Sequence, residues 1–163
     1  MQVGARTSSL PLGGIAGYGR RTGPATEQRV EDFVRFRYFD PLQQSTVEGE
    51  LTEGAEVAEL VALVTQLGGD CSPALELTGR DGSSLVLGIA QDRAVVLWTS
   101  VDGTTSHSVG GPSEARAVFD YFGAFTQVPG HYTVPLTAAV HAAGGYVDAH
   151  GRGGWATLPL AVD

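Results

Sequence analysis

The sequence contains no lysine, and its ten basic residues are all arginines. We attribute this to GC-rich coding, because arginine codons are rich in G and C, and not to a functional requirement. Cys71 is the single cysteine, which excludes an intrachain disulfide and makes a reducing cytoplasm the expected compartment. A lone cysteine of this kind is more often a small buried apolar residue than a nucleophile.

Long apolar runs are missing as well. None reaches the roughly 18 residues that a membrane-spanning helix requires, so we expect no membrane partner. The opening stretch MQVGARTSSLPLGGIAGYG has only a short apolar part interrupted by glycines, which makes it a poor signal peptide.

Recognisable catalytic and metal-binding motifs are also absent. There is no cysteine pair, no His-x-Glu of a deaminase and no G-x-S-x-G elbow, and the histidines are not spaced as metal ligands. His107 lies between two serines, but neighbouring strand residues point to opposite faces, so it is interpreted as an ordinary strand histidine. We therefore expect no metal, no cofactor and no enzymatic activity.

Charge is distributed unevenly along the chain. Six arginines and three carboxylates precede Asp40, which gives that segment a charge of +3. From Asp40 onward there are four arginines and 15 carboxylates, which gives −11 and accounts for the net charge of −8. A body this acidic repels nucleic acids and membrane surfaces and attracts basic partners.

Composition divides the chain into two parts. Residues 1–28 are rich in glycine and arginine without helical or alternating periodicity, and are predicted to form a flexible basic arm. Its GYGRRTG segment departs by one residue from the dinucleotide-binding fingerprint and follows no strand. Residues 29–163 are predicted to form a single α+β domain.

Periodicity predicts the elements of that domain. Alternation over residues 30–41 favours a strand with one face on the core, although its mixture of arginine and aromatic residues could also stack on bases. A first helix is expected to begin at Thr52 or Glu53 and to end at Gly68–Gly69. Residues 74–110 are predicted to form an antiparallel meander with Asp-Gly turns at Asp81 and Asp102.

The remaining segments complete the predicted fold. One aromatic strand is expected from Ala117 through DYFGAF, although a helix is also compatible with this stretch. A second helix is expected to open at Pro135 and to be weakened at Gly144–Gly145, and GGWATLPL is predicted to form a short last strand. The fold class is therefore α+β, an antiparallel meander sheet with two packed helices.

The candidate partner-binding residues combine carboxylates with nearby large aromatics. Aromatic side chains are favoured at the centres of interfaces, and a rim of carboxylates accelerates encounter with a basic surface. The alternative is that the two tryptophans fill the core and the acids only maintain solubility. The predicted contacts are Trp98, Asp102, Asp120, Tyr121, Tyr132, Asp148 and Trp155.

Several motifs follow one another in a familiar order. They are the helix EVAELVALVTQL, the hairpin with its Asp-Gly turn, SHSVGG, the aromatic DYFGAF, TVPLTAAVHAA and the tryptophan of GGWATLP. From about Glu53 to Pro159 this order resembles the first Imm family of immunity proteins, which belong to bacterial polymorphic toxin systems and are often paired with deaminase toxins.

The resemblance implies a cytoplasmic antitoxin, either a monomer or one member of a 1:1 complex. It would bind a cognate secreted toxin domain, a nucleic-acid deaminase or nuclease, and occlude its basic substrate groove. It also implies a toxin gene immediately upstream. Two alternatives remain: an acidic effector-binding chaperone or adaptor without inhibitory activity, and a small-ligand-binding protein or enzyme, which would require a deep pocket with converging titratable groups.

Overall fold

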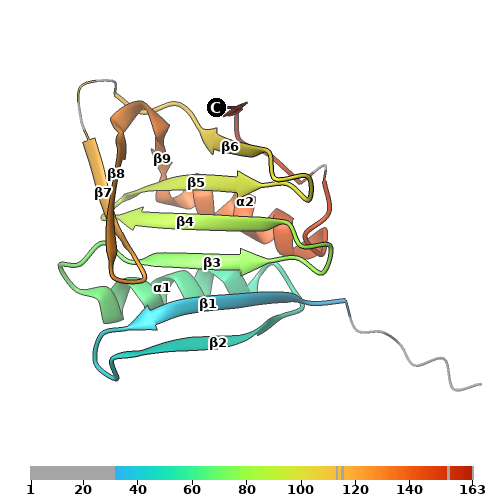
Figure 1. Cartoon of the computed structure of the whole chain (residues 1–163), viewed down its shortest axis with the longest axis horizontal. Coiled ribbons are helices and arrows are strands. Elements are labelled where there is room, and N and C mark those ends of the chain that lie inside the picture. Colours follow the sequence, from blue (N-terminus) through green and yellow to red (C-terminus); the bar gives the residue numbers. More distant parts are fainter. Residues whose placement is uncertain (1–31, 113, 115, 154, 163) are drawn as a thin grey trace, which may run out of the picture. The chain divides into compact units, whose positions relative to one another are not determined.

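The computed structural model describes residues 32–112, 114, 116–153 and 155–162 (Figure 1). The arm expected over residues 1–28 and the first residues of the strand expected from position 30 lie outside the described residues. No helix in the described part of the chain is long and apolar enough to cross a membrane.

An antiparallel sheet forms the centre of the domain. In the described residues it has eight strands in the order β10-β6-β5-β4-β3-β1-β2, with β9 paired to β5 beside β6. Consecutive strands β3 to β6 are neighbours, which confirms the predicted meander. The strands are β1 (Val34–Asp40), β2 (Ser45–Leu51), β3 (Ala74–Thr78), β4 (Ser84–Ala90), β5 (Arg93–Thr99), β6 (Thr105–Ser108), β9 (Thr133–Pro135) and β10 (Leu160–Val162).

The two faces of the sheet are covered differently. Helices α1 (Glu56–Gly68) and α2 (Leu136–Asp148) pack on one face, behind the sheet in Figure 1. A separate hairpin, β7 (Arg116–Tyr121) and β8 (Ala124–Pro129), crosses the other face, and a 3-10 turn (Gly130–Tyr132) leads from it into β9. The α+β fold class with two packed helices is confirmed.

The main core lies between the sheet and the helices. Alternate residues of β3, β4 and β5 face the helices and are almost fully buried, among them Leu75, Leu87 and Val96. Val57 and Val64 from α1 and Tyr146 from α2 close this layer. The predicted helical stripe thus covers the sheet, as an amphipathic helix must to remove its apolar side from water.

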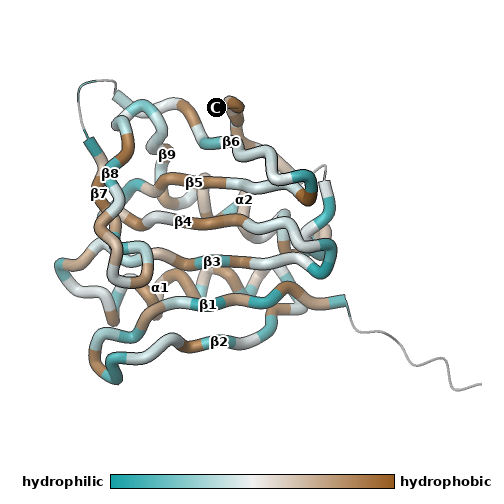
Figure 2. Tube along the Cα trace, viewed as in Figure 1, coloured by the Kyte–Doolittle hydropathy of each residue, from teal (hydrophilic) through white to brown (hydrophobic). Residues whose placement is uncertain are grey.

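A smaller core joins the hairpin to the opposite face of the sheet. Phe119 and Val128 from the hairpin pack on Ala74 and Val95 of the sheet. Hydrophobic residues are accordingly concentrated in the central strands, whereas hydrophilic residues mark the turns at their ends (Figure 2). The sheet therefore has apolar layers on both sides, the larger one under the helices.

Two sequence predictions about strands were wrong. The edge strand β2 was missed because its sequence, STVEGEL, places only Val47, Gly49 and Leu51 on the helix-facing side. The single aromatic strand is instead the hairpin β7–β8, which turns at Phe122 and Gly123 with φ angles of 52° and 90°. Positive φ at both central positions is the conformation of a hairpin turn, which sequence analysis expects from Asn-Gly and not from Phe-Gly.

The helix boundaries and the last strand also differ from expectation. Helix α1 begins at Glu56, whose carboxylate accepts the backbone N–H groups of Thr52 and Glu53 at 2.9 Å. Helix α2 continues through Gly144 and Gly145, where a weakening had been predicted. Gly144 allows the helix to lie close to Gly54, because a Cβ at Gly144 would be only 3.1 Å from the Gly54 carbonyl oxygen. The last strand begins at Leu160, so Trp155 lies outside it.

Candidate partner-binding surfaces

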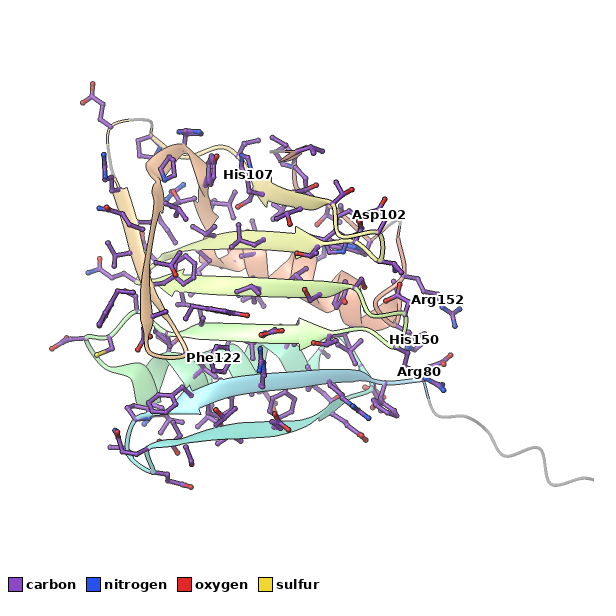
Figure 3. The ribbon with its side chains drawn as sticks, in the orientation of Figure 1. Arg80, Asp102, His107, Phe122, His150 and Arg152 are labelled. Carbon is purple, nitrogen blue, oxygen red and sulfur yellow. The ribbon has the colours of Figure 1, made fainter. Side chains whose placement is uncertain are left out.

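The β5–β6 turn holds the carboxylate of Asp102 at one end of the sheet (Figure 3). The Ser100 hydroxyl and the backbone N–H of Thr104, at 2.9 Å, both donate to Asp102 Oδ1. These hydrogen bonds, led by that of Ser100, lower the pKa of Asp102 from 3.8 to about 2. Asp102 is therefore a fixed, fully exposed negative charge at every physiological pH.

The two tryptophans lie on the helix-facing side of the sheet. The indoles of Trp98 and Trp155 meet edge to face with ring centroids 5.9 Å apart, and Trp155 also meets Tyr146 at 5.6 Å. Trp155 is 5% exposed, whereas Trp98 is partly exposed beside the core. Contact of either tryptophan with a partner stays a prediction. Trp155 packs beneath Trp98 and Tyr146 as part of the core.

Asp120 and Tyr121 come together with β1 and β3 residues at the tip of the β7–β8 hairpin. The Tyr121 hydroxyl donates to Glu76 Oε2 at 2.9 Å, and the guanidinium of Arg37 binds the same oxygen at 2.7 Å. Burial, followed by the contact with Glu76, raises the pKa of Tyr121. Arg37 also lies over the ring of Phe122, 4.7 Å from its centroid. Tyr121 therefore belongs to a polar network that fastens the hairpin to the sheet.

The turn itself depends on Asp120. Its Oδ1 accepts the backbone N–H of Gly123 at 2.6 Å, which closes the tight turn around Phe122. Just beyond the turn, Phe125 is 75% exposed on the outer face of the hairpin. Phe125 was not among the predicted contact residues.

Tyr132 and Asp148 occupy two further, separate places. The Tyr132 ring stacks on the imidazole of His107, with centroids 3.5 Å apart, beside the hairpin core. Asp148 ends α2, and its Oδ1 accepts the backbone N–H of Gly54 at 2.6 Å, which ties α2 to the start of α1. The seven predicted contacts therefore do not form one patch; Asp102, for example, lies at the opposite end of the strands from Phe122, the neighbour of Tyr121 in the chain (Figure 3).

The basic side chains that follow α2 lie near a carboxylate at the start of the described chain. His150 and Arg152 approach Asp32 at 4.0 and 3.9 Å, and Arg80 approaches it at 3.6 Å; the three basic side chains are labelled in Figure 3. These partly exposed pairs contribute little to stability. Among the described residues no group of three or more His, Cys, Asp or Glu side chains is placed to hold a metal ion.

A groove runs between α1 and α2 on the outer side of the helix layer, and we call it the helix groove. Two adjoining hollows make it up, and they share Ala58, Thr137 and Val140. Its surface is mainly apolar because alanine, valine and leucine side chains supply much of the lining. The lining residues are Gly54, Ala55, Ala58, Val61, Ala62, Thr65, Gln66, Leu136, Thr137, Val140, His141, Gly144, Gly145 and Asp148.

The charges around the helix groove have one sign. Every formally charged side chain in α1 and α2 is a carboxylate, and Glu53 precedes α1. On the opposite face of the sheet, by contrast, Arg35 and Arg37 lie directly across from Glu50 and Glu48, and Arg37 is paired with Glu76. Among the described residues, arginines therefore accompany the carboxylates on the sheet face, whereas neither helix contains an arginine beside its carboxylates.

The family model for immunity protein Imm1 matches residues 48–153. The chain belongs to the Imm1 family. The match extends from within β2 to just beyond α2, close to the range of residues 53–159 that the motifs suggested. No curated protein matches the chain.

The Imm1 match covers the helix groove and most of the predicted contacts. Both helices and the β7–β8 hairpin lie within it, as do all the predicted contacts except Trp155. Strand β1, which supplies Arg37, lies outside it. Membership makes this chain an immunity protein with a toxin as its partner.

The helix groove is the feature of this Imm1 protein that sequence analysis missed. A signal was present, because Ala55, Ala58 and Ala62 recur at helical spacing on the exposed side of the predicted helix. Alanines at such positions are usual in any helix, and the groove becomes visible only when α2 is packed beside α1.

Proposed function

We propose that this immunity protein neutralises a toxin that acts on nucleic acid, a deaminase or a nuclease, by binding its toxic domain and covering the basic substrate groove. The protein acts in the cytoplasm, one molecule per toxin domain, and catalyses no reaction. Of the predicted contacts, Asp148 lies on the acidic helix layer and Asp102 attracts the toxin from one end of the sheet, whereas Asp120, Tyr121 and Tyr132 belong to the hairpin side.

The observation that carries this proposal is the uncompensated negative charge of the helix layer. Glu53, Glu56, Glu59 and Asp148 are all exposed there, and neither helix contains an arginine. A toxin that handles nucleic acid needs a positively charged groove, because phosphate neutralisation dominates its affinity for substrate. An acidic surface is attracted to that groove and competes with the substrate for it.

Charge alone does not give the required affinity. Stoichiometric protection inside a cell needs a Kd of about 1 nM or less, or about −12 kcal/mol. Interfaces of this strength depend on a few desolvated apolar or aromatic anchors surrounded by polar residues. An acidic layer that also contains an apolar groove meets both requirements.

The test is inhibition of the toxin domain encoded beside this gene. Purified toxin domain is assayed on single-stranded and duplex DNA and on RNA, with increasing amounts of the immunity protein. We expect activity to disappear at one equivalent, and excess nucleic acid to slow formation of the complex. A complex that forms while the toxin remains fully active would contradict the proposal and favour a chaperone or adaptor.

A further inference from the structure

We propose that the helix groove is the docking surface for the toxin. Its occupant is a toxin segment with apolar side chains on one side and arginine or lysine next to them. This inference rests on the proposed function and names the surface through which that function is exerted.

The first argument is the shape and polarity of the groove. On the α1 side it is formed by exposed alanines, including Ala58 and Ala62, and on the α2 side by Thr137 and Val140. The buried side chain of Val61 reaches its floor. A continuous apolar hollow between two exposed helices is the kind of surface that receives a segment of another protein.

The second argument is charge. The charged residues next in sequence to the lining residues of α1 are all carboxylates: Glu53 beside Gly54, Glu56 beside Ala55 and Glu59 beside Ala58. Asp148 of α2 lines the groove itself, and no arginine in either helix offsets these charges. Basic side chains on the occupant therefore meet only carboxylates. A second copy of this chain would instead bring two acidic layers together, which like-charge repulsion opposes.

The third argument is that the opposite face of the sheet has less free surface for a basic, apolar partner. The β7–β8 hairpin already covers part of the other side of the sheet through Phe119 and Val128. The charged residues that remain there, such as Arg37 and Glu76, are bound to each other. The outer face of the hairpin also exposes apolar side chains, Phe125 and Val118, but arginines accompany the carboxylates on that side of the sheet, whereas the charged side chains of the two helices are carboxylates alone.

The experiment compares two matched arginine substitutions in neighbouring positions of α1. Ala62→Arg places a long cationic side chain in the groove, whereas Leu63→Arg adds the same charge at a position that is 43% exposed and outside the groove lining. Arginine is a good helix former, and Ala62 is exposed, so both variants are expected to fold. Thermal unfolding verifies this before binding is measured.

Binding is measured by titration calorimetry against the toxin domain encoded beside the gene, in a catalytically inactive form. We expect Ala62→Arg to raise Kd by at least about 30-fold, the effect of a hot-spot residue, and Leu63→Arg to change it by less than about threefold. Equal affinities for wild type and Ala62→Arg would overturn the groove proposal. Sedimentation of the free protein as a dimer that Ala62→Arg dissociates would also overturn it.

Cross-linking supplies a second, direct measurement. A photoreactive group is attached at Ala58→Cys or, as the control, at Val118→Cys on the outer face of β7, each in a Cys71→Ser chain. We expect the toxin to be cross-linked from position 58 and not from position 118, and the reverse result would overturn the proposal. If toxin binds through the groove yet stays active, the proposed inhibition fails while the docking surface stands. If wild type and Ala62→Arg inhibit the toxin equally, the proposed inhibition stands while the docking surface fails.

Discussion

Phe119 of β7 lies directly over Gly88 of β4, so that a Cβ at Gly88 would come within 2.5 Å of the phenyl ring. Gly88 thus leaves the space that the hairpin needs to lie on the sheet. We expect Gly88→Ala to lower the free energy of unfolding by about 1–3 kcal/mol, the usual cost of overpacking. Urea unfolding measures this change. Gly153→Ala is the control, because a Cβ there meets no atom within 4 Å, and an equal effect of both substitutions would contradict the account.

The β7–β8 turn allows a test of backbone strain. Phe122 has a φ of 52°, which asparagine tolerates better than a bulky residue, but it also contacts Arg37. Phe122→Asn removes about 1 kcal/mol of strain and a cation–π contact of similar size, so we expect a net change below about 1 kcal/mol. Gly123→Ala, at a φ of 90° in open space, should cost about 1–2 kcal/mol. Chemical unfolding of both variants checks this order, and a larger loss for Phe122→Asn would contradict it.

Asp102 predicts a dependence of stability on pH. Its pKa is lowered to about 2 in the folded protein, so the folded state favours the ionised carboxylate. This contribution is fully present above the ordinary value of 3.8 and is lost as the pH falls toward 2. Urea midpoints of wild type and Asp102→Asn between pH 6 and pH 2 should differ at the upper end and converge at the lower. A difference that does not depend on pH would show that the carboxylate charge is not responsible.

The same residue should influence how fast the toxin binds. Asp102→Arg changes the charge of the exposed turn by two units, so we expect slower association and a weaker dependence of the association rate on salt. The dissociation rate should change little, because the effect acts before close contact. Stopped-flow association at rising ionic strength measures both rates, and wild type and variant should converge at high salt. Unchanged association at low salt would exclude Asp102 from steering.

Sequence periodicity was sufficient for most of the fold. The meander and α1 were predicted because their side chains alternate between core and solvent, as in Leu75 and Glu76, or recur at helical spacing, as in Val57 and Val64. Strand β2 was not predicted, because an edge strand buries few side chains. The β7–β8 turn was not predicted, because local propensity disfavours a Phe-Gly turn. The turn is stabilised by the contact of Arg37 with Phe122 and by the hydrogen bond from the Gly123 N–H to Asp120.

The partner-binding residues were harder to predict than the fold. Charge and aromatic content indicated a basic partner, but the side chain of Trp155 is taken up by packing against Trp98 and Tyr146. The helix groove depends on two helices about 70 residues apart in the chain, and a single sequence does not reveal which of their exposed faces meet. Surfaces of this kind follow from tertiary packing and not from local pattern.

The origin of the helix groove in two distant segments has a consequence for the timing of protection. During translation α1 emerges early, but its alanines have no opposing wall until the ribosome has passed Asp148 and α2 has docked through the Gly54 amide. If the helix groove is the docking surface, as we propose, a truncated chain that lacks α2 has only one wall of that surface and does not bind the toxin. The proposed docking surface is then completed only late in synthesis, when α2 has been added to the chain.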